Sequence, residues 1–146
     1  MCDKNELLNS IKSSFQHALD IVAIKRNIES EITDIVDLIR ASTNDVVYAV
    51  IDKPEKTQNT PYYYSGLSRY DKIIRLSSNA NHEICYFLCA YSLNKSTGFP
   101  VAINYKNEEF SCNTIETLKL TLKNILTSPE TAMAMANLFN GKDAGY

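Results

Sequence analysis

Glycine and histidine are both scarce in this chain of 146 residues, which contains four glycines and two histidines. Backbone cradles for phosphate groups usually need several closely spaced glycines, and no glycine-rich phosphate loop occurs. The chain also has neither a G-x-S-x-G nucleophile elbow nor a zincin helix motif. These absences argue against several large catalytic classes, so we predict that the protein is not an enzyme and holds no cofactor.

An excess of charge of one sign and long apolar runs are missing as well. The net charge of −2 and the pI near 5.7 provide no overall positive field that would attract nucleic acid or an anionic membrane. No stretch approaches the roughly 18 consecutive apolar residues of a membrane-spanning helix, and the initial MCDKNELLNS lacks the pattern of a signal peptide. We therefore expect a cytoplasmic protein with no membrane partner.

The cysteines are Cys2, Cys85, Cys89 and Cys112. Cys85 and Cys89 are four apart in a predicted strand, which would put their side chains on one face, near His82. Structural zinc sites usually need two closely spaced ligand pairs, and the chain has no second pair. A cysteine nucleophile would need a histidine base, and the candidates are His17 and His82. Nothing in the sequence marks a cysteine as activated. We therefore favour reduced, buried structural cysteines and expect no metal.

Residues 3–42 form a predicted helical segment, because no glycine or proline interrupts them and apolar residues recur three and four apart. The first stripe is Leu8, Ile11, Phe15, Ala18 and Val22, and the second is Ile28, Ile32, Ile35 and Ile39. The second stripe is shifted around the helix. This pattern predicts either one helix of about 35 to 38 residues or two helices that meet near Asn27. A single helix would project beyond the domain, and its stripe would need a partner chain, such as a second copy in a homodimeric coiled coil. The alternative is that the stripe packs on its own domain.

Residues 45–113 have the pattern of an antiparallel sheet of about five strands. Strands are predicted at 46–51, 72–76, 83–93, 99–105 and 108–112, with a further short strand at 62–64 inside a long excursion at 53–70. The strand at 46–51 is apolar on both faces, which is typical of an interior strand. A two-residue turn at 106–107 predicts a hairpin whose register puts Ile103 opposite Phe110 and Val101 opposite Cys112.

Two helices are predicted at the C-terminal end, within residues 114–140. The first has an N-cap signal at Asn113 and an apolar stripe of Ile115, Leu118, Leu122, Ile125 and Leu126. The second begins at Ser128-Pro129 and has Ala132, Met135, Ala136 and Phe139 as its predicted apolar face. The fold class predicted for residues 1–146 is therefore a single α+β domain.

The most unusual segment joins tyrosines with basic residues. The candidate binding residues are Tyr62, Tyr63, Tyr64, Arg69, Tyr70, Lys72 and Arg75. Tyrosine gives a large contact area at a low cost in rotamer entropy, and arginine adds planar hydrogen bonding, so the segment is a candidate protein-binding anchor. The same residues could stack a nucleotide or single-stranded nucleic acid, although the local charge excess is small. In a third interpretation the tyrosines simply cover a sheet edge.

The leading hypothesis is a small non-catalytic interaction protein that binds and modulates another macromolecule, most readily another protein. Immunity proteins that neutralise toxins and antagonists of antiviral defence are inhibitors of this general kind, by analogy alone. The alternatives are nucleotide or single-stranded nucleic-acid binding by residues 61–75 and a cysteine-dependent enzyme. No resemblance to a family is specific enough to name.

Overall fold

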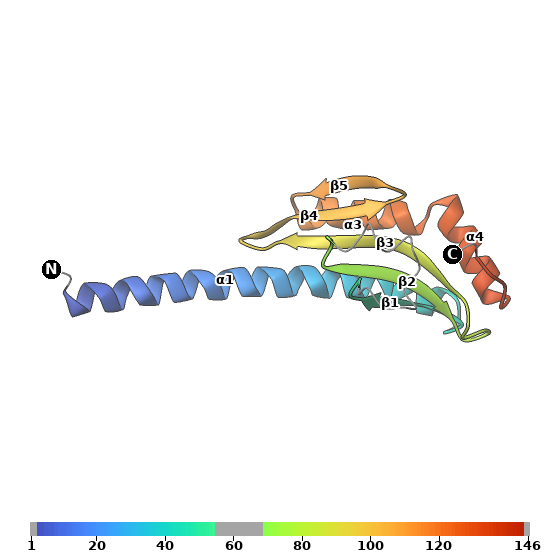
Figure 1. The fold of residues 1–146 in the computed structure, drawn as a ribbon, viewed down its shortest axis with the longest axis horizontal. Helices are drawn as coiled ribbons and strands as arrows, with labels where there is room; N and C mark the ends of the chain where they lie inside the picture. Colours follow the sequence, from blue (N-terminus) through green and yellow to red (C-terminus); the bar gives the residue numbers. More distant parts are fainter. Residues whose placement is uncertain (1–2, 55–68, 145–146) are drawn as a thin grey trace.

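The structure is a computed structural model of the chain that describes residues 3–54 and 69–144. Its helices are α1 (Lys4–Val36), α2 (Leu38–Ser42), α3 (Ile115–Leu126) and α4 (Pro129–Phe139). Its strands are β1 (Val47–Asp52), β2 (Lys72–Ser78), β3 (Cys85–Asn94), β4 (Gly98–Tyr105) and β5 (Glu108–Cys112). The predicted α+β fold class is confirmed, with a long N-terminal helix, a five-stranded antiparallel sheet and two C-terminal helices (Figure 1).

The sheet is an antiparallel meander with the order β1-β2-β3-β4-β5. The predicted hairpin register is confirmed, because Ile103 pairs with Phe110 and Val101 pairs with Cys112. The turn residues Lys106 and Asn107 have φ angles of 53° and 64°. Two consecutive positive φ angles are the signature of the type I′ turn, whose twist matches that of the flanking strands.

Among the strands of residues 3–54 and 69–144, β1 pairs with β2 alone and lies at the edge of the sheet, so the prediction of an interior strand is wrong. Its two apolar faces have different neighbours. Val47 is fully buried on the face that the helices cover. Tyr48 points to the opposite face, where the guanidinium of Arg40 lies 4.8 Å from the ring centroid. A short strand with an aromatic residue under a cation can thus look like an interior strand.

One face of the sheet packs against all four helices and forms the main core with them. This core contains Ile28, Ile32 and Val36 of α1, Ile39 of α2, Leu118, Leu122 and Ile125 of α3, and Leu138 of α4. Ile74, Leu76, Tyr91, Val101 and Ile103 face these helices from the sheet. The opposite face carries a smaller apolar cluster around Tyr70, Ile73 and Ala90. The fold therefore has two layers, with the helices on one side of the sheet.

The C-terminal helices confirm one predicted apolar face and correct another. In α3 the predicted residues Leu118, Leu122 and Ile125 are buried, and Ile115 and Leu126 are partly buried. The N-cap is Thr114, not Asn113, because the Thr114 side chain accepts from the Thr117 N–H. In α4 the buried residues are Thr131, Ala134 and Leu138, and Phe139 is exposed. The predicted face of α4 is therefore wrong. Alanine and methionine occur all around this helix, so apolar spacing does not distinguish one face from its neighbour.

Helix α1 runs through Asn27 without a break, so the alternative of two helices meeting there does not hold. The chain turns at Asp37 and continues as the short α2. At 33 residues and about 1.5 Å per residue, α1 is roughly 50 Å long. Figure 1 shows its N-terminal half extending well past the sheet. In the described part of the chain, no helix is both long enough and apolar enough to cross a lipid bilayer.

Candidate interaction surfaces

The projecting half of α1 begins with a side-chain cap and contains only helix-compatible residues. Asp3 is the N-cap, and its side chain accepts a hydrogen bond from the Asn5 N–H at 3.2 Å. Every residue from 3 to 20 is exposed to solvent. An isolated helix of this length gains little stability from hydrogen bonds alone, because most helices are stabilised by packing of an apolar face. This half of α1 makes no such packing contact within the described residues.

The packed half of α1 begins where the helix meets the turn between β3 and β4. A Cβ atom added to Gly98 would lie 3.0 Å from Ile24 Cγ2 and 3.3 Å from Ile28 Cδ1, so glycine permits this close approach. The Lys25 ammonium donates to the Lys95 carbonyl oxygen at 2.5 Å. Farther along, the buried Tyr91 hydroxyl donates to Glu29 Oε2 at 2.7 Å. These contacts fix the helix to the sheet and define where the projection starts.

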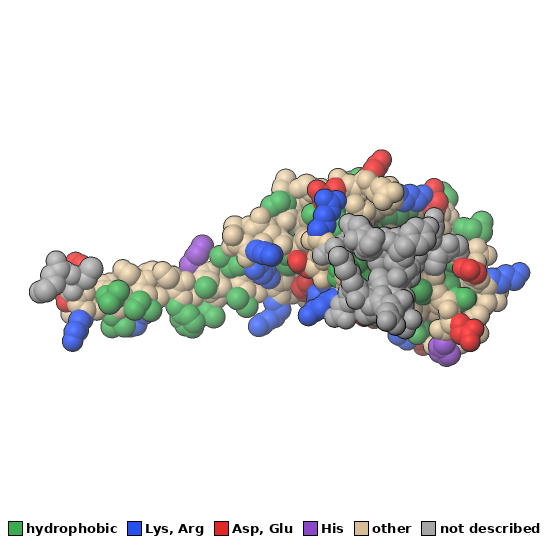
Figure 2. Space-filling view, in the orientation of Figure 1, with side chains coloured by type: hydrophobic (Ala, Val, Ile, Leu, Met, Phe, Trp, Pro, Cys, Tyr) green, Lys and Arg blue, Asp and Glu red, His purple; other side chains and the backbone are tan. Residues whose placement is uncertain are grey.

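The projecting half carries a continuous row of large apolar side chains on one side. The exposed residues are Leu7, Leu8, Ile11, Phe15, Leu19 and Val22. Phe15 has 63% of its surface accessible and Ile11 has 57%. Figure 2 shows these apolar side chains gathered along one edge of the projection. We call this set, together with the small residue Ala18, the α1 stripe.

Sequence reasoning found most of the α1 stripe but missed Leu7 and Leu19. Both flank the three-and-four spacing that the prediction followed, and they widen the apolar face. At about 100° per residue, the stripe lies roughly a quarter turn around the helix from the buried Ile28 and Ile32. The phase shift near Asn27 therefore marks the change from an exposed face to a buried face, with no break in the helix.

The predicted tyrosine-rich site is partly outside the described residues, because Tyr62, Tyr63 and Tyr64 belong to residues 55–68. Its described members are Arg69, Tyr70, Lys72 and Arg75.

Tyr70 is buried on the sheet face opposite the helices, and its hydroxyl is the centre of a small network. It donates to Glu109 Oε1 at 2.6 Å and accepts from Asn104 Nδ2 at 3.3 Å and from Arg69 Nη2 at 3.1 Å. The Arg69 guanidinium also lies 4.9 Å from the Tyr70 ring centroid. Burial, followed by the hydrogen bond to Glu109, raises the pKa of Tyr70. Tyr70 is thus held by internal contacts.

The two remaining basic residues of the predicted site point to opposite faces of the sheet. The Lys72 ammonium lies 3.5 Å from Glu29 Oε2 on the side that α1 covers. Arg75 lies on the other side, where Nε donates to Asp52 Oδ2 at 2.8 Å and Nη1 donates to Ser77 Oγ at 2.9 Å. Residues three apart in a strand alternate in this way, so the signal was present in the sequence. The structure does not bring these two cations together.

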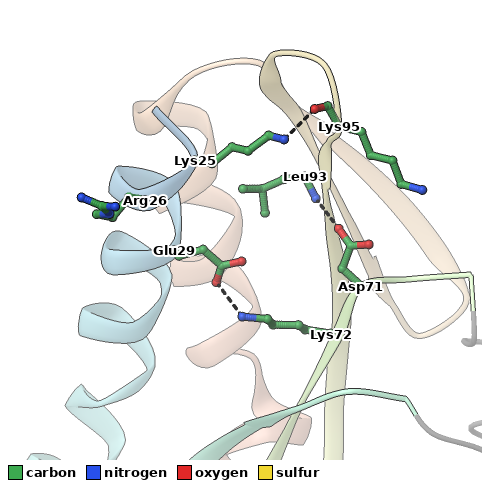
Figure 3. Close-up of a pocket in the computed structure, with 7 residues that line it drawn as sticks. All are labelled: Lys25, Arg26, Glu29, Asp71, Lys72, Leu93 and Lys95. Carbon is green, nitrogen blue, oxygen red and sulfur yellow. Dashed lines mark hydrogen bonds and ion pairs between the residues drawn. The ribbon is translucent and has the colours of Figure 1, made fainter. Parts of the chain in front are cut away.

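A hollow of about 330 Å³ lies between α1 and the sheet where the projection begins. It is lined by Lys25, Arg26, Glu29, Asp71, Lys72, Leu93 and Lys95. Figure 3 shows Lys72 paired with Glu29, and Asp71 accepting from the Leu93 N–H at 3.2 Å. Arg26 and Lys95 point away from the hollow (Figure 3). Its cations therefore do not converge on a common point, as an anion site would require.

Among the cysteines in the described residues, Cys89 and Cys112 are buried and Cys85 is partly buried. Burial raises the pKa of Cys89 to about 12, and burial also raises the pKa of Cys112. The prediction that Cys85 and Cys89 share a face is wrong, because the pairing of β3 with β2 skips Leu88. This bulge puts both Leu88 and Cys89 in the main core, while Cys85 pairs with Ser77. No cluster of metal-ligating side chains occurs among residues 3–54 and 69–144.

Comparisons with family models, with curated proteins and with solved structures found no match for this chain. Its function is therefore inferred from the geometry of the surfaces described above.

Proposed function

We propose that this chain is a non-catalytic binding protein that engages another protein chain through the α1 stripe. The observation that carries the proposal is the exposure of six large apolar side chains along one side of a projecting helix. Soluble proteins rarely expose a contiguous apolar patch of more than a few hundred Å² unless it is an interaction site. A helix that presents its apolar face in this way also has a ready mode of recognition, as a partner to another helix or to an apolar groove.

The chemistry of the remaining candidate residues supports binding over catalysis. A cysteine nucleophile needs a lowered pKa, whereas burial raises the pKa of both Cys89 and Cys112. Nucleotide binding by the tyrosine-rich segment gains no support from its described members. The Tyr70 hydroxyl is held by internal hydrogen bonds, and Lys72 and Arg75 each face a carboxylate.

Site-specific photo-cross-linking tests the proposal directly. A benzophenone amino acid would replace Phe15 in the α1 stripe, and the matched control would carry it at the exposed His17, well outside the stripe. In cells that naturally make the protein, we expect a discrete protein adduct from position 15 and much less from position 17. Equal labelling from the two positions, or no adduct from position 15, would contradict a binding role for the stripe.

A further inference from the structure

The α1 stripe has the spacing of one strand of a coiled coil. Leu8, Ile11, Phe15, Ala18 and Val22 alternate between three-residue and four-residue steps, which is the spacing of the a and d positions of a heptad. The face is continuous from Leu8 to Val22, and each of its large members is roughly half exposed or more. This spacing favours another helix as the missing partner.

We propose that this helix is the α1 of a second copy of the chain, which lies antiparallel to the first. This inference rests on the proposed function, because it names the occupant of the same stripe. A pair related by two-fold symmetry presents the same patch from both copies, so each contact occurs twice.

Side-chain volumes favour one antiparallel register. When Phe15 of one copy faces Ala18 of the other, Ile11 faces Val22, and both contacts are repeated by symmetry. A large side chain opposite a small one fills the space between two helices, as close packing requires. In the same register Leu8 faces the aliphatic stem of Lys25, whose ammonium keeps its hydrogen bond to the Lys95 carbonyl oxygen. A parallel pair would instead put Phe15 against Phe15 and Ala18 against Ala18.

Charge also favours the antiparallel arrangement. The tip of the projection has Asp3 and Glu6 against one Lys4, while Lys25 and Arg26 lie at its base. Arg26 follows Leu19 by seven residues, so it continues the side of the helix that the stripe occupies. An antiparallel pair brings the acidic tip of each copy to the basic base of the other, and it also opposes the two helix dipoles. A parallel pair would bring like charges together at both ends.

The shape of the molecule is compatible with this assembly. The stripe lies on the part of α1 that extends past the sheet (Figures 1 and 2). In an antiparallel pair the two folded bodies would therefore lie at opposite ends of the shared helices. The Arg26 side chain points away from the hollow at the base of α1, toward the space that the second helix would approach (Figure 3).

The first experiment measures the mass of the full chain in solution by light scattering after size exclusion. We expect twice the chain mass of 16.5 kDa at about 100 μM, which is a hundredfold above a micromolar dissociation constant. The variant Phe15→Glu should raise the dissociation constant by more than about tenfold, because it buries two unpaired charges in the seam. The matched control His17→Glu should remain dimeric, and circular dichroism should show that both variants are folded.

The second experiment tests orientation by oxidative cross-linking in a Cys2→Ser background. The antiparallel register predicts a disulfide in a mixture of the Ile11→Cys and Val22→Cys variants. It predicts none from either variant alone, because the two identical cysteines would lie roughly 16 Å apart along the helices. A parallel pair predicts a disulfide from each variant alone and none between the two variants in the mixture.

Each alternative result overturns a defined part of the inference. A monomer at about 100 μM would overturn self-association, and so would a dissociation constant that Phe15→Glu leaves unchanged. Disulfides formed by the single variants alone would overturn the antiparallel order. If the chain is monomeric but the position-15 photo-cross-linker labels a different protein, the binding function stands and the second copy is wrong. Both proposals would be overturned by a third result. In that result the monomer binds lipid vesicles, Phe15→Glu abolishes this binding, and the photo-cross-linker gives no protein adduct.

Discussion

The two halves of α1 have similar apolar spacing and very different surroundings. Ile28 and Ile32 in the packed half are 0% and 1% exposed, whereas Ile11 and Phe15 in the projecting half are 57% and 63% exposed. The packed half is fixed by the close approach of Gly98 and by the hydrogen bond from Tyr91 to Glu29. The comparison shows that one apolar pattern can serve two purposes in a single helix. One stripe closes the core of the chain, and the other is available to a partner.

The largest expected difference between the halves is in stability. Ile32→Ala should lower the free energy of unfolding by about 2 to 5 kcal/mol, because it leaves a cavity in the main core. Ile11→Ala should change it by less than about 0.5 kcal/mol in dilute solution, since the side chain is already exposed there. Urea unfolding followed by circular dichroism measures both values. Equal losses would mean that the projecting half is packed against the domain in solution.

A glycine substitution at the junction of the two halves should have the next largest effect. Gly98 and Gly141 both have positive φ angles, of 87° and 72°. Alanine at either position incurs backbone strain, but at Gly98 the new Cβ would also meet Ile24 at 3.0 Å, whereas at Gly141 the nearest atom is 3.6 Å away. We expect Gly98→Ala to cost about 2 to 3 kcal/mol and Gly141→Ala about 1 kcal/mol.

Thermal and urea unfolding of the two alanine variants provide the measurement. Gly141→Ala is the control for backbone strain, so the difference between the variants reports how tightly α1 is seated on the turn. Indistinguishable stabilities would show that α1 shifts away from the sheet at little cost.

The smallest of these effects concerns the hydrogen bond between the sheet and the packed half. Burial, followed by the hydrogen bond to Glu29, raises the pKa of Tyr91 above its usual value of 10.0. Tyr91→Phe should cost about 1 kcal/mol at neutral pH, because the Glu29 carboxylate loses one donor but still faces Lys72. Tyr48→Phe is the matched control on the edge strand.

The pH dependence of the same variant follows from the direction of the pKa shift. Below pH 10 Tyr91 keeps its proton in both the folded and the unfolded chain, so its contribution to stability is constant. As the pH rises above about 10, the unfolded chain releases this proton first, and stability should fall by up to about 1.4 kcal/mol per pH unit. Tyr91→Phe should therefore show a shallower alkaline decline than the wild type. Parallel declines in the two proteins would contradict the assigned burial of the hydroxyl.

Much of the fold could be predicted from the sequence because its signals are local. The turn at Lys106 and Asn107 fixes the register of β4 and β5, and the stripe of α3 is marked by Leu118 and Leu122 on one side of a polar helix. Features that depend on distant partners could not be predicted in this way. They include the edge position of β1, the buried face of α4 and the bulge that separates the directions of Cys85 and Cys89.

The candidate site shows the same division between local and distant information. The sequence predicts a site of basic residues near the tyrosines. In the fold, however, Lys72 forms an ion pair with Glu29 of α1, and Arg75 forms one with Asp52 of β1. The sequence also identified the stripe from Leu8 to Val22. Spacing along the chain cannot tell whether such a stripe is buried or exposed, because that depends on whether a sheet lies beside it.

By itself, the sequence determined the helical character of residues 3–42, the two phases of their apolar residues and the type of the last hairpin, because each depends on neighbours within a few residues. Only the tertiary structure decided which phase is buried. The sheet reaches α1 as far as Gly98, so Ile28 packs against it while Phe15 lies beyond its end. The physical reason is the difference in length between a helix of roughly 50 Å and strands of at most ten residues, which span about 33 Å.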